Sequence, residues 1–288
     1  MNARRRSHPR AAAPPRDWRA ALRKLGDEHG YFECLGADHG ALFIDDGPRL
    51  IVTFEQAHAL TPGRSHATFG QRLAAVQGWS HLCLVADGPT FYRDDTVFRY
   101  FDRLVEDAFF EDFDHVLIYG AGVGAHGAVA FSVTAPGATV VAVQPVATLD
   151  SAVTGWDPRL APFRRLAASH RYRHAPDMIE GAGDVFIVFD PFEPLDAAQA
   201  ALFDRPFVQP LCCRNLGPQI EDALRRMGML DAMLLAAGAG KLSAARFYDL
   251  YRARRDDGVY LDRLYARSRF AGKTGLAQCI SRLRAALG

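Results

Sequence analysis

The stretch VLIYGAGVGAHGAVAFS, residues 116–132, decides how this chain folds. Its apolar start is typical of a buried strand, and it leads into closely spaced glycines and then into small residues of helical character. Small residues allow a helix to approach a strand closely. The first turn of such a helix offers backbone N–H groups to whatever lies above the end of the strand. We therefore predict a strand, a tight turn and a helix here, with amide hydrogens free at the turn.

Strand-like and helix-like runs alternate on both sides of this stretch. Runs that are apolar throughout occupy residues 49–54, 81–87, 115–120, 138–145, 184–190 and 206–212. Strands that are covered by helices on both faces have this composition, and their alternation with helices predicts a mostly parallel, doubly wound α/β sheet. A further run at 41–44 is separated from the strand at 49–54 by a turn signal, so we expect the two to be antiparallel.

Composition along the chain divides it into three parts. Residues 1–16 are rich in Arg, Ala and Pro and are predicted to be a disordered basic tail. Residues 17–235 are predicted to be the α/β domain. Within it, residues 151–183 interrupt the alternation and are a candidate cap over the carboxyl edge of the sheet. Strand-like runs stop after this domain, so residues 236–288 are expected to be a C-terminal helical extension.

The overall composition excludes several classes of protein. The 34 basic and 33 acidic residues give a net charge of +1, so no global field attracts nucleic acid. No apolar run reaches the roughly 18 residues that a membrane span needs. Five cysteines without a framework spacing favour a reducing, cytoplasmic location. No Cys/His spacing predicts a zinc site, and we expect neither a metal nor a cofactor.

The glycine turn fits two patterns, of which the first is a dinucleotide-binding fingerprint. Gly122, Gly124 and Gly127 match G-x-G-x-x-G. That fingerprint expects an acidic residue at the end of the next strand to bind the ribose, whereas this chain has Gln144–Pro145 there. It also usually opens its domain, whereas at least three strand-like runs precede this turn. A nucleotide-binding, Rossmann-like oxidoreductase is kept as an alternative.

The second pattern is the nucleophile elbow G-x-S-x-G, which is also a strand, turn and helix. Residues 120–124 fit it with Gly122 at the serine position. Together with the order of the strands, this turn resembles the elbow of the α/β-hydrolase superfamily, which follows the fifth strand. The resemblance extends to bacterial hydrolase-like proteins of polysaccharide and surface-glycan loci and covers roughly residues 40–235. Its further matches are GAGVGAH (120–126), Gln144–Pro145, Trp156–Asp157–Pro158–Arg159, FDP (189–191) and RNLG (214–217).

The resemblance implies a Ser-His-acid triad, and two of its three positions are altered in this chain. Gly122 has no side chain with which to attack a substrate, and Pro218 stands where the family places its histidine. Asp190 stands at the acid position, although a turn residue before Pro191 would also explain it. The loss of two members together implies that serine-hydrolase chemistry is gone, while the shape of the site can remain.

Residues around the turn are candidates for binding a ligand. Ala121, Gly122 and Val123 offer backbone groups at the turn itself. Glu55 follows a strand at the place where the family builds its oxyanion hole. A carboxylate that faced inward there would repel an oxyanion, in keeping with the loss of acyl transfer.

Two further residues are candidates for substitute chemistry. His126 lies one turn into the helix and either faces the site or is a buried structural histidine. Cys212 ends a strand close to the missing histidine and is either a core cysteine or one half of a thiol–imidazole dyad with His126.

The leading hypothesis is a catalytically degenerate α/β-hydrolase-like protein, a pseudoenzyme. It would bind a small anionic, acyl or glycan-type ligand, or a protein partner, at the carboxyl ends of the strands. The candidate cap is rich in arginine, which either favours an anionic ligand or only forms a solvated helix face. These arginines are Arg159, Arg164, Arg165, Arg171 and Arg173. An active esterase or acyltransferase of the same fold with a relocated nucleophile is the other alternative. The sequence leaves the oligomeric state open.

Overall fold

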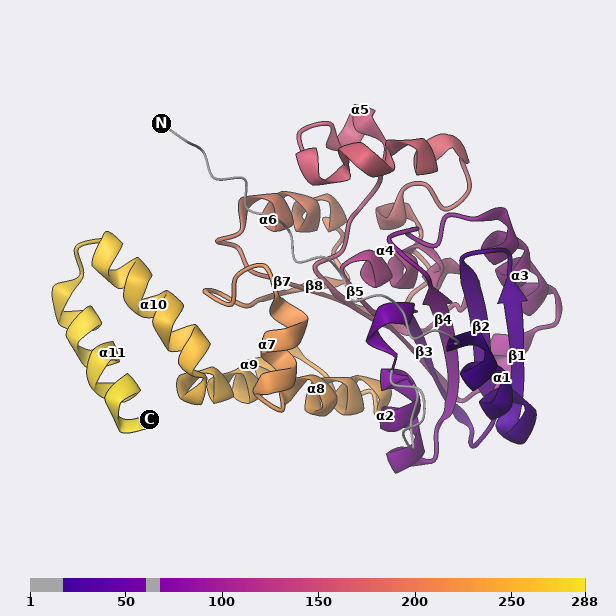
Figure 1. Ribbon diagram of the computed structural model, residues 1–288, viewed down its shortest axis with the longest axis horizontal. Coiled ribbons are helices and arrows are strands. Elements are labelled where there is room, and N and C mark those ends of the chain that lie inside the picture. The colour runs from indigo at the N-terminus through magenta and orange to yellow at the C-terminus, as the bar shows by residue number, and fades with distance from the viewer. Residues whose placement is uncertain (1–17, 61–67, 288) are drawn as a thin grey trace.

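The computed structural model describes residues 18–60 and 68–287, which form one eight-stranded sheet with helices on both faces (Figure 1). The tail predicted at residues 1–16 lies outside the described residues. The strands are β1 (Gly30–Leu35), β2 (His39–Ile44), β3 (Arg49–Gln56), β4 (Ser80–Ala86), β5 (His115–Ala121), β6 (Thr139–Val143), β7 (Asp184–Phe189) and β8 (Val208–Cys212). The α-helices are α1 (Trp18–His29), α2 (Phe69–Gln77), α3 (Asp95–Glu106), α4 (Val123–Ala130), α5 (Ser151–Thr154), α6 (Pro194–Ala200), α7 (Ile220–Arg226), α8 (Met229–Gly238), α9 (Ala244–Leu250), α10 (Gly258–Phe270) and α11 (Thr274–Leu287).

The strands lie in the order β1-β2-β4-β3-β5-β6-β7-β8. The pairs β1–β2 and β2–β4 are antiparallel, whereas every pair from β4 to β8 is parallel. This confirms the predicted α/β sheet, with the glycine turn after its fifth strand. The turn therefore lies in the middle of one continuous sheet and does not open a separate nucleotide-type domain.

The antiparallel edge of the sheet differs from the sequence-based prediction in two ways. β1 was not predicted, because its residues GYFECL include a glutamate and are only partly buried, so they give no continuous apolar run. β2 runs antiparallel to β3 as expected but is hydrogen-bonded to β4. β3 cannot pair with β2, because both of its edges are already occupied, by β4 and β5.

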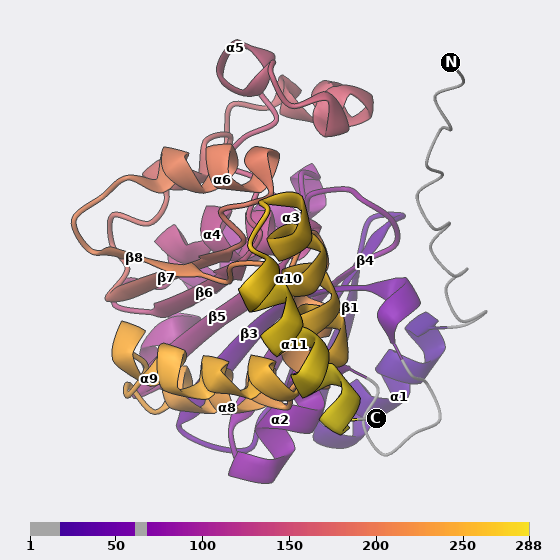
Figure 2. The same ribbon diagram turned by 90° about the vertical axis from the view of Figure 1, so that its left-hand side faces the viewer.

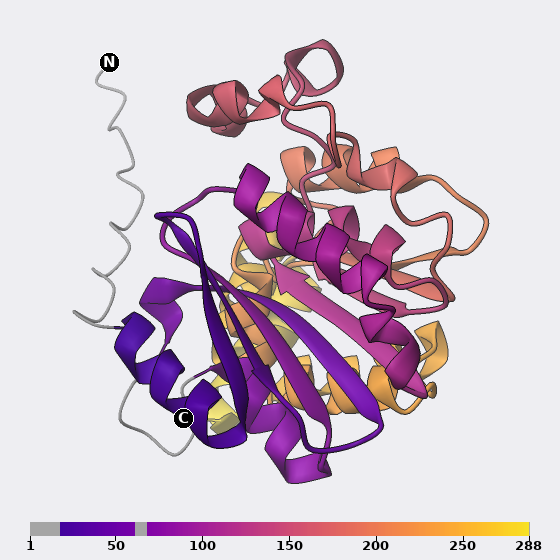
Figure 3. The ribbon, with the colours of Figure 1, turned by 90° about the vertical axis from the view of Figure 1, so that its right-hand side faces the viewer.

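Alternate residues along each strand face two separate cores, as the pleat of a strand requires. On β3, Leu50 and Val52 face the core that α3 and α4 cover, whereas Ile51 faces the core that α2, α7 and α8 cover. Figure 2 shows α4 and α6 on one side of the sheet and α8 on the other. Figure 3 shows the β1–β2 edge, where α1 packs on one face through Leu22 and Leu42.

Two segments extend beyond these layers. Residues 150–168 hold α5 and the turns that follow it, and they lie above α6 at the top of Figure 1. Leu149 and Leu160 pack there against Phe91. Helices α10 and α11 pack against each other and project to the left in the same view.

The C-terminal boundary stays a prediction, and residue 235 falls inside α8. The buried face of that helix, including Leu230 and Met233, belongs to the core beneath the sheet. Across residues 18–60 and 68–287, the helices are all too short or too polar to cross a membrane.

Candidate functional site

The turn between β5 and α4 has the backbone of a strained elbow. Gly122, the residue between the two elements, has φ 55° and ψ −115°, and it is exposed at the carboxyl edge of the sheet. Its N–H donates to the Val143 carbonyl at 2.8 Å, which ties the turn to β6. Residues with side chains rarely adopt this conformation, and sharp strand-to-helix turns use it to expose a nucleophile. The bend is thus present in this chain, while the side chain that it would display is absent.

The glycines on either side of Gly122 are required by packing. A Cβ atom on Gly120 would lie 2.2 Å from the Gly124 carbonyl oxygen, and one on Gly124 would lie 2.3 Å from the Phe54 carbonyl oxygen. Both neighbours are backbone atoms, which cannot rotate away. These two glycines therefore allow α4 to start directly against β5 and β3.

Gly122 itself is under no such constraint. A Cβ atom built on it meets no atom of the described residues within 4 Å. Sterically, a serine would fit at the elbow. The N–H of Val123, the first residue of α4, has no acceptor within the helix because the first turn of a helix lacks one. What the turn offers is a backbone amide beside open space.

Asp190, at the acid position, holds two backbone amides. The residue is buried, and its two carboxylate oxygens accept from the N–H of Phe192 at 2.9 Å and from the N–H of Gly217 at 2.8 Å. The second of these bonds fixes the loop after β8. Asp190 thus secures the loop that in the family would present a histidine, although no histidine stands there.

Pro218, at the histidine position, takes part in a hydrogen-bond network through its backbone carbonyl. The carbonyl of Pro218 accepts from Nε2 of Gln144 at 3.1 Å. The same nitrogen donates to Asp196 at 2.6 Å, and Oε1 of Gln144 accepts from the N–H of Ile220 at 3.1 Å. Gln144 therefore joins the end of β6 to the first turn of α6 and to the start of α7. It stands where a dinucleotide site would need an acidic residue.

His126 lies beneath the turn, away from solvent. Its side chain is fully buried, Nδ1 donates to the Val146 carbonyl at 2.8 Å, and the ring packs edge-on against Phe91. Nε2 is buried without a hydrogen-bond partner among the described residues. Burial lowers the pKa of His126 to about 4. The imidazole is therefore neutral at pH 7 and part of the packing under α4.

We expect His126 to destabilise the protein in acid. The unfolded chain takes up a proton near pH 6.5 and the folded chain only near pH 4, so the unfolded state binds more protons between these values. Stability should fall through this window by about 3 kcal/mol from this residue. The measurement is the free energy of unfolding from pH 7.5 to 4 for the wild type and His126→Gln. The variant should lose less stability over the window, whereas the exposed His170→Gln should behave like the wild type; equal slopes in all three proteins would refute the assignment.

Cys212, the other candidate for substitute chemistry, is not brought to His126. It ends β8, three strands from β5, a separation of about 14 Å. Its side chain is half-buried in a hollow of about 320 Å³ that Tyr248, Tyr251 and Arg254 also line. Burial raises the pKa of the Cys212 thiol, so little thiolate is present at pH 7. The described geometry gives no support to a dyad of these two residues.

Glu55 lines a hollow of about 480 Å³ that begins next to Ala121 of the elbow. Its carboxylate accepts from the N–H groups of Phe69 and Gly70, both at 2.9 Å, and from the hydroxyl of Thr53 at 2.9 Å. Burial raises the pKa of Glu55. The three hydrogen bonds lower this pKa in part, and repulsion from Glu221 raises it further. The side chain thus anchors the start of α2 at the rim of the hollow.

Residues that the sequence analysis did not single out form the opposite wall of this hollow. The hydroxyl of Tyr119 donates to Glu221 at 2.7 Å, and Arg225 donates to the same carboxylate at 2.6 Å. The Arg225 guanidinium lies 4.1 Å from the centre of the Phe69 ring. The alternation along β5 places Tyr119 on the α7 side of the sheet, but only the fold brings α7 next to α2.

Four of the five arginines of the candidate cap are bound within the protein, whereas Arg165 is exposed. Arg159 pairs with Asp157 and Asp196. The other ion pairs and carbonyl contacts are Arg171 with Asp102, Arg173 with Asp150, and Arg164 with the carbonyls of Leu149 and Thr154. These contacts hold the segment together and join it to α3 and α6, which leaves the four side chains little capacity to attract an anionic ligand.

Comparison with known proteins finds similar solved structures but no matching sequence family. No family model and no curated protein matches the sequence. Among solved structures, the chain is similar to a capsule O-acetyltransferase of Neisseria meningitidis serogroup A, with 14% identity over 69% of this chain and 92% of that one and a TM-score of 0.41. It is also similar to the esterase LipW of Mycobacterium marinum, with 13% identity, coverage of 82% and 86%, and a TM-score of 0.47. A chain of the Glycosylation Associate Protein (Gap123) complex of Streptococcus agalactiae matches at 12% identity, coverage of 71% and 45%, and a TM-score of 0.46.

The sheet and its turn identify the architecture. The sheet is parallel from β4 to β8, and a strained strand-to-helix bend follows the fifth strand, with its tip exposed at the carboxyl edge. Asp190 follows the seventh strand and reaches the loop after the eighth. The chain therefore has the α/β-hydrolase fold.

Proposed function

We propose that this chain is a catalytically silent member of the α/β-hydrolase fold that binds a small glycan-type ligand in the hollow beside the elbow. The observation that carries the proposal is Gly122: the strained bend is present and its tip is open, but it holds no attacking oxygen. Pro218 supplies no imidazole. Acyl transfer needs a nucleophile and a base to take its proton. A backbone amide alone stabilises charge without starting the reaction.

The lining of the hollow favours a neutral or cationic polar ligand over an anion. Among the described residues that line the hollow, three are acidic, Glu55, Glu221 and Asp222, and one is an arginine, Arg225. Carboxylates accept hydrogen bonds from hydroxyl and ammonium groups and repel other anions. Phe69 and Tyr119 add aromatic surface against which the apolar face of a sugar ring can pack. The volume of about 480 Å³ is that of a small-molecule site.

Binding measurements with saccharides test this proposal. We expect neutral and amino sugars or their short oligomers to bind with measurable heat or chemical-shift changes, and uronic acids to bind at least about 10-fold more weakly. Glu221→Gln should weaken the best ligand by roughly 10-fold, because it removes the charge while keeping the shape. The exposed Glu111→Gln serves as the matched control and should leave binding unchanged.

Three outcomes would contradict the proposal. The first is that none of the saccharides binds, and the second is that uronic acids bind best. The third is hydrolysis of simple acyl esters by the purified wild type at a rate above that of the buffer. The third outcome would favour the alternative of a relocated nucleophile instead.

A further inference from the structure

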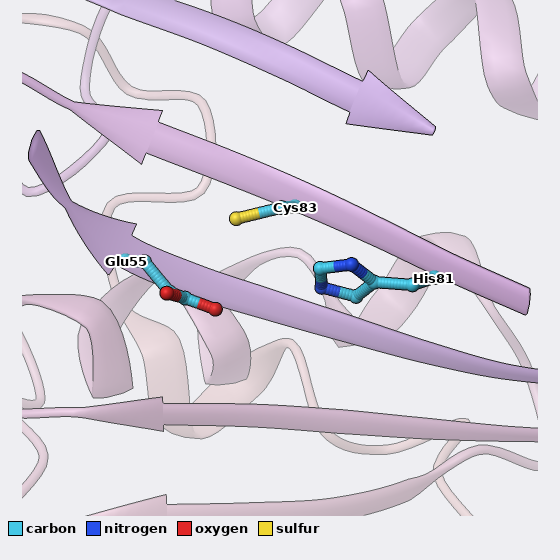
Figure 4. Close-up of side chains that lie close together, drawn as sticks. All are labelled: Glu55, His81 and Cys83. Atoms are coloured by element: carbon cyan, nitrogen blue, oxygen red, sulfur yellow. The ribbon is translucent and has the colours of Figure 1, made fainter. Parts of the chain in front are cut away.

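Three side chains that could bind a metal lie close together between β3 and β4 (Figure 4). The cluster consists of Glu55 on β3 and of His81 and Cys83 on β4. One potential ligand atom from each residue lies within 4.8 Å of the other two. His81 and Cys83 are two residues apart on one strand, so their side chains are on the same face. Their side chains are fully buried.

The hydrogen bonds around the cluster show which nitrogen of His81 faces it. Nε2 lies 2.8 Å from the Thr53 hydroxyl, which donates to Glu55 at 2.9 Å. Figure 4 shows the far end of the His81 ring, which carries Nε2, on the side of Glu55 and Cys83. Nε2 is therefore the nitrogen that a metal in the cluster would reach, in exchange for its hydrogen bond to Thr53. Nδ1 is buried and has no hydrogen-bond partner among the described residues.

Glu55 has capacity left for a metal. Of its two oxygens, Oε1 accepts from Gly70 and from Thr53, whereas Oε2 accepts from Phe69. A carboxylate offers about four lone-pair sites. Gly70 keeps the space open, because a Cβ atom at that position would lie 2.2 Å from Nε2 of His81.

We propose that Glu55, His81 and Cys83 bind one Zn²⁺ ion. The mixed oxygen, nitrogen and sulfur set suits Zn²⁺, whereas Mg²⁺ and Ca²⁺ prefer oxygen alone. The carboxylate and a thiolate would balance the charge of the ion in this buried place. On binding, the Cys83 thiol releases its proton to solvent and its sulfur forms the bond to the metal.

Geometry and position indicate a structural ion. Bonds of about 2.0–2.3 Å to a tetrahedral Zn²⁺ place the ligand atoms about 3.5 Å apart, so small side-chain rotations close the present spacing. The Thr53 hydroxyl or a water molecule takes the fourth position. The ion would join β3 and β4 to the start of α2, since Glu55 already holds the first amides of that helix. The proposal does not depend on the glycan-type ligand.

Metal analysis of the full chain tests the site. The protein is stripped with a chelator and titrated with Zn²⁺, and the retained metal and the melting temperature are measured. We expect one Zn²⁺ per chain and a rise in melting temperature of roughly 5 °C. With Co²⁺ in its place, the absorption spectrum should show a thiolate-to-cobalt charge-transfer band.

Matched variants locate the metal. Cys83→Ser and His81→Gln should bind Zn²⁺ at least roughly 100-fold more weakly, and the cobalt band should vanish in Cys83→Ser. Cys213→Ser and His126→Gln, which alter a buried cysteine and a buried histidine elsewhere, should bind like the wild type. Wild-type protein that retains no zinc and gives no thiolate band would overturn the proposal even if the variants fail to fold. A band that persists in Cys83→Ser would overturn it as well.

Discussion

Replacement of Gly120 by alanine is expected to lower the free energy of unfolding by about 4 kcal/mol, at the upper end of single substitutions. The new Cβ atom would lie 2.2 Å from the Gly124 carbonyl oxygen, well inside contact distance. The clash is between two parts of the backbone, so α4 would have to move away from β5. That movement would open the core around Ala125 and Val129, both fully buried.

Chemical denaturation of a glycine series measures this effect. The new Cβ atom of Gly122→Ala meets no atom of residues 18–60 and 68–287 within 4 Å, so this variant should cost only about 1–2 kcal/mol, from its positive φ. Gly275→Ala lies inside α11 in open space and should be neutral or slightly stabilising. The packing explanation fails if Gly120→Ala proves as mild as Gly275→Ala.

Removal of the Asp190 carboxylate in Asp190→Ala is expected to cost a similar amount, about 4 kcal/mol. The substitution leaves the N–H groups of Phe192 and Gly217 without an acceptor in a buried place, and each such group costs about 1–3 kcal/mol. Asp190→Asn keeps one oxygen as acceptor and should lose about half as much. The readout is again the free energy of unfolding.

The matched control is Asp204→Ala, an exposed aspartate in the loop before β8. It should change stability by less than about 0.5 kcal/mol. If Asp190→Ala is as stable as this control, the carboxylate has no structural role, and a function in binding or chemistry would be the better explanation of its position.

These two predictions suggest why the hydrolase pattern is only partly present. The residues that the chain does have, Gly120, Gly124 and Asp190, all hold the fold together through backbone contacts or buried hydrogen bonds. The two that it lacks have no such role: the space at Gly122 is open, and Pro218 contributes through its backbone carbonyl. A protein that bound a ligand without catalysis could lose the serine and the histidine, but it would have to keep the two glycines and the aspartate.

The local sequence determined the α/β class, the elbow and most of the strands. A fully buried strand is apolar throughout, and the close approach of α4 to β5 and β3 needs glycine at 120 and 124, so both leave a signal in consecutive residues. The altered positions Gly122 and Pro218 could likewise be read directly from the spacing of the motif. The edge strand β1 was missed because one partly exposed edge strand has no such uniform composition.

Only the tertiary structure decided which side chains meet. Whether His126 faced the site or the core, and whether it could reach Cys212, depended on the order of strands in the sheet. Tyr119 meets Glu221, 102 positions away, and Arg171 of the candidate cap meets Asp102, 69 positions away. The same holds for Glu55 beside His81 and Cys83, since β3 and β4 are neighbours in space with α2 between them in sequence. Side-chain proximity of this kind is set by the register between strands and by helix packing, which short sequence motifs do not encode.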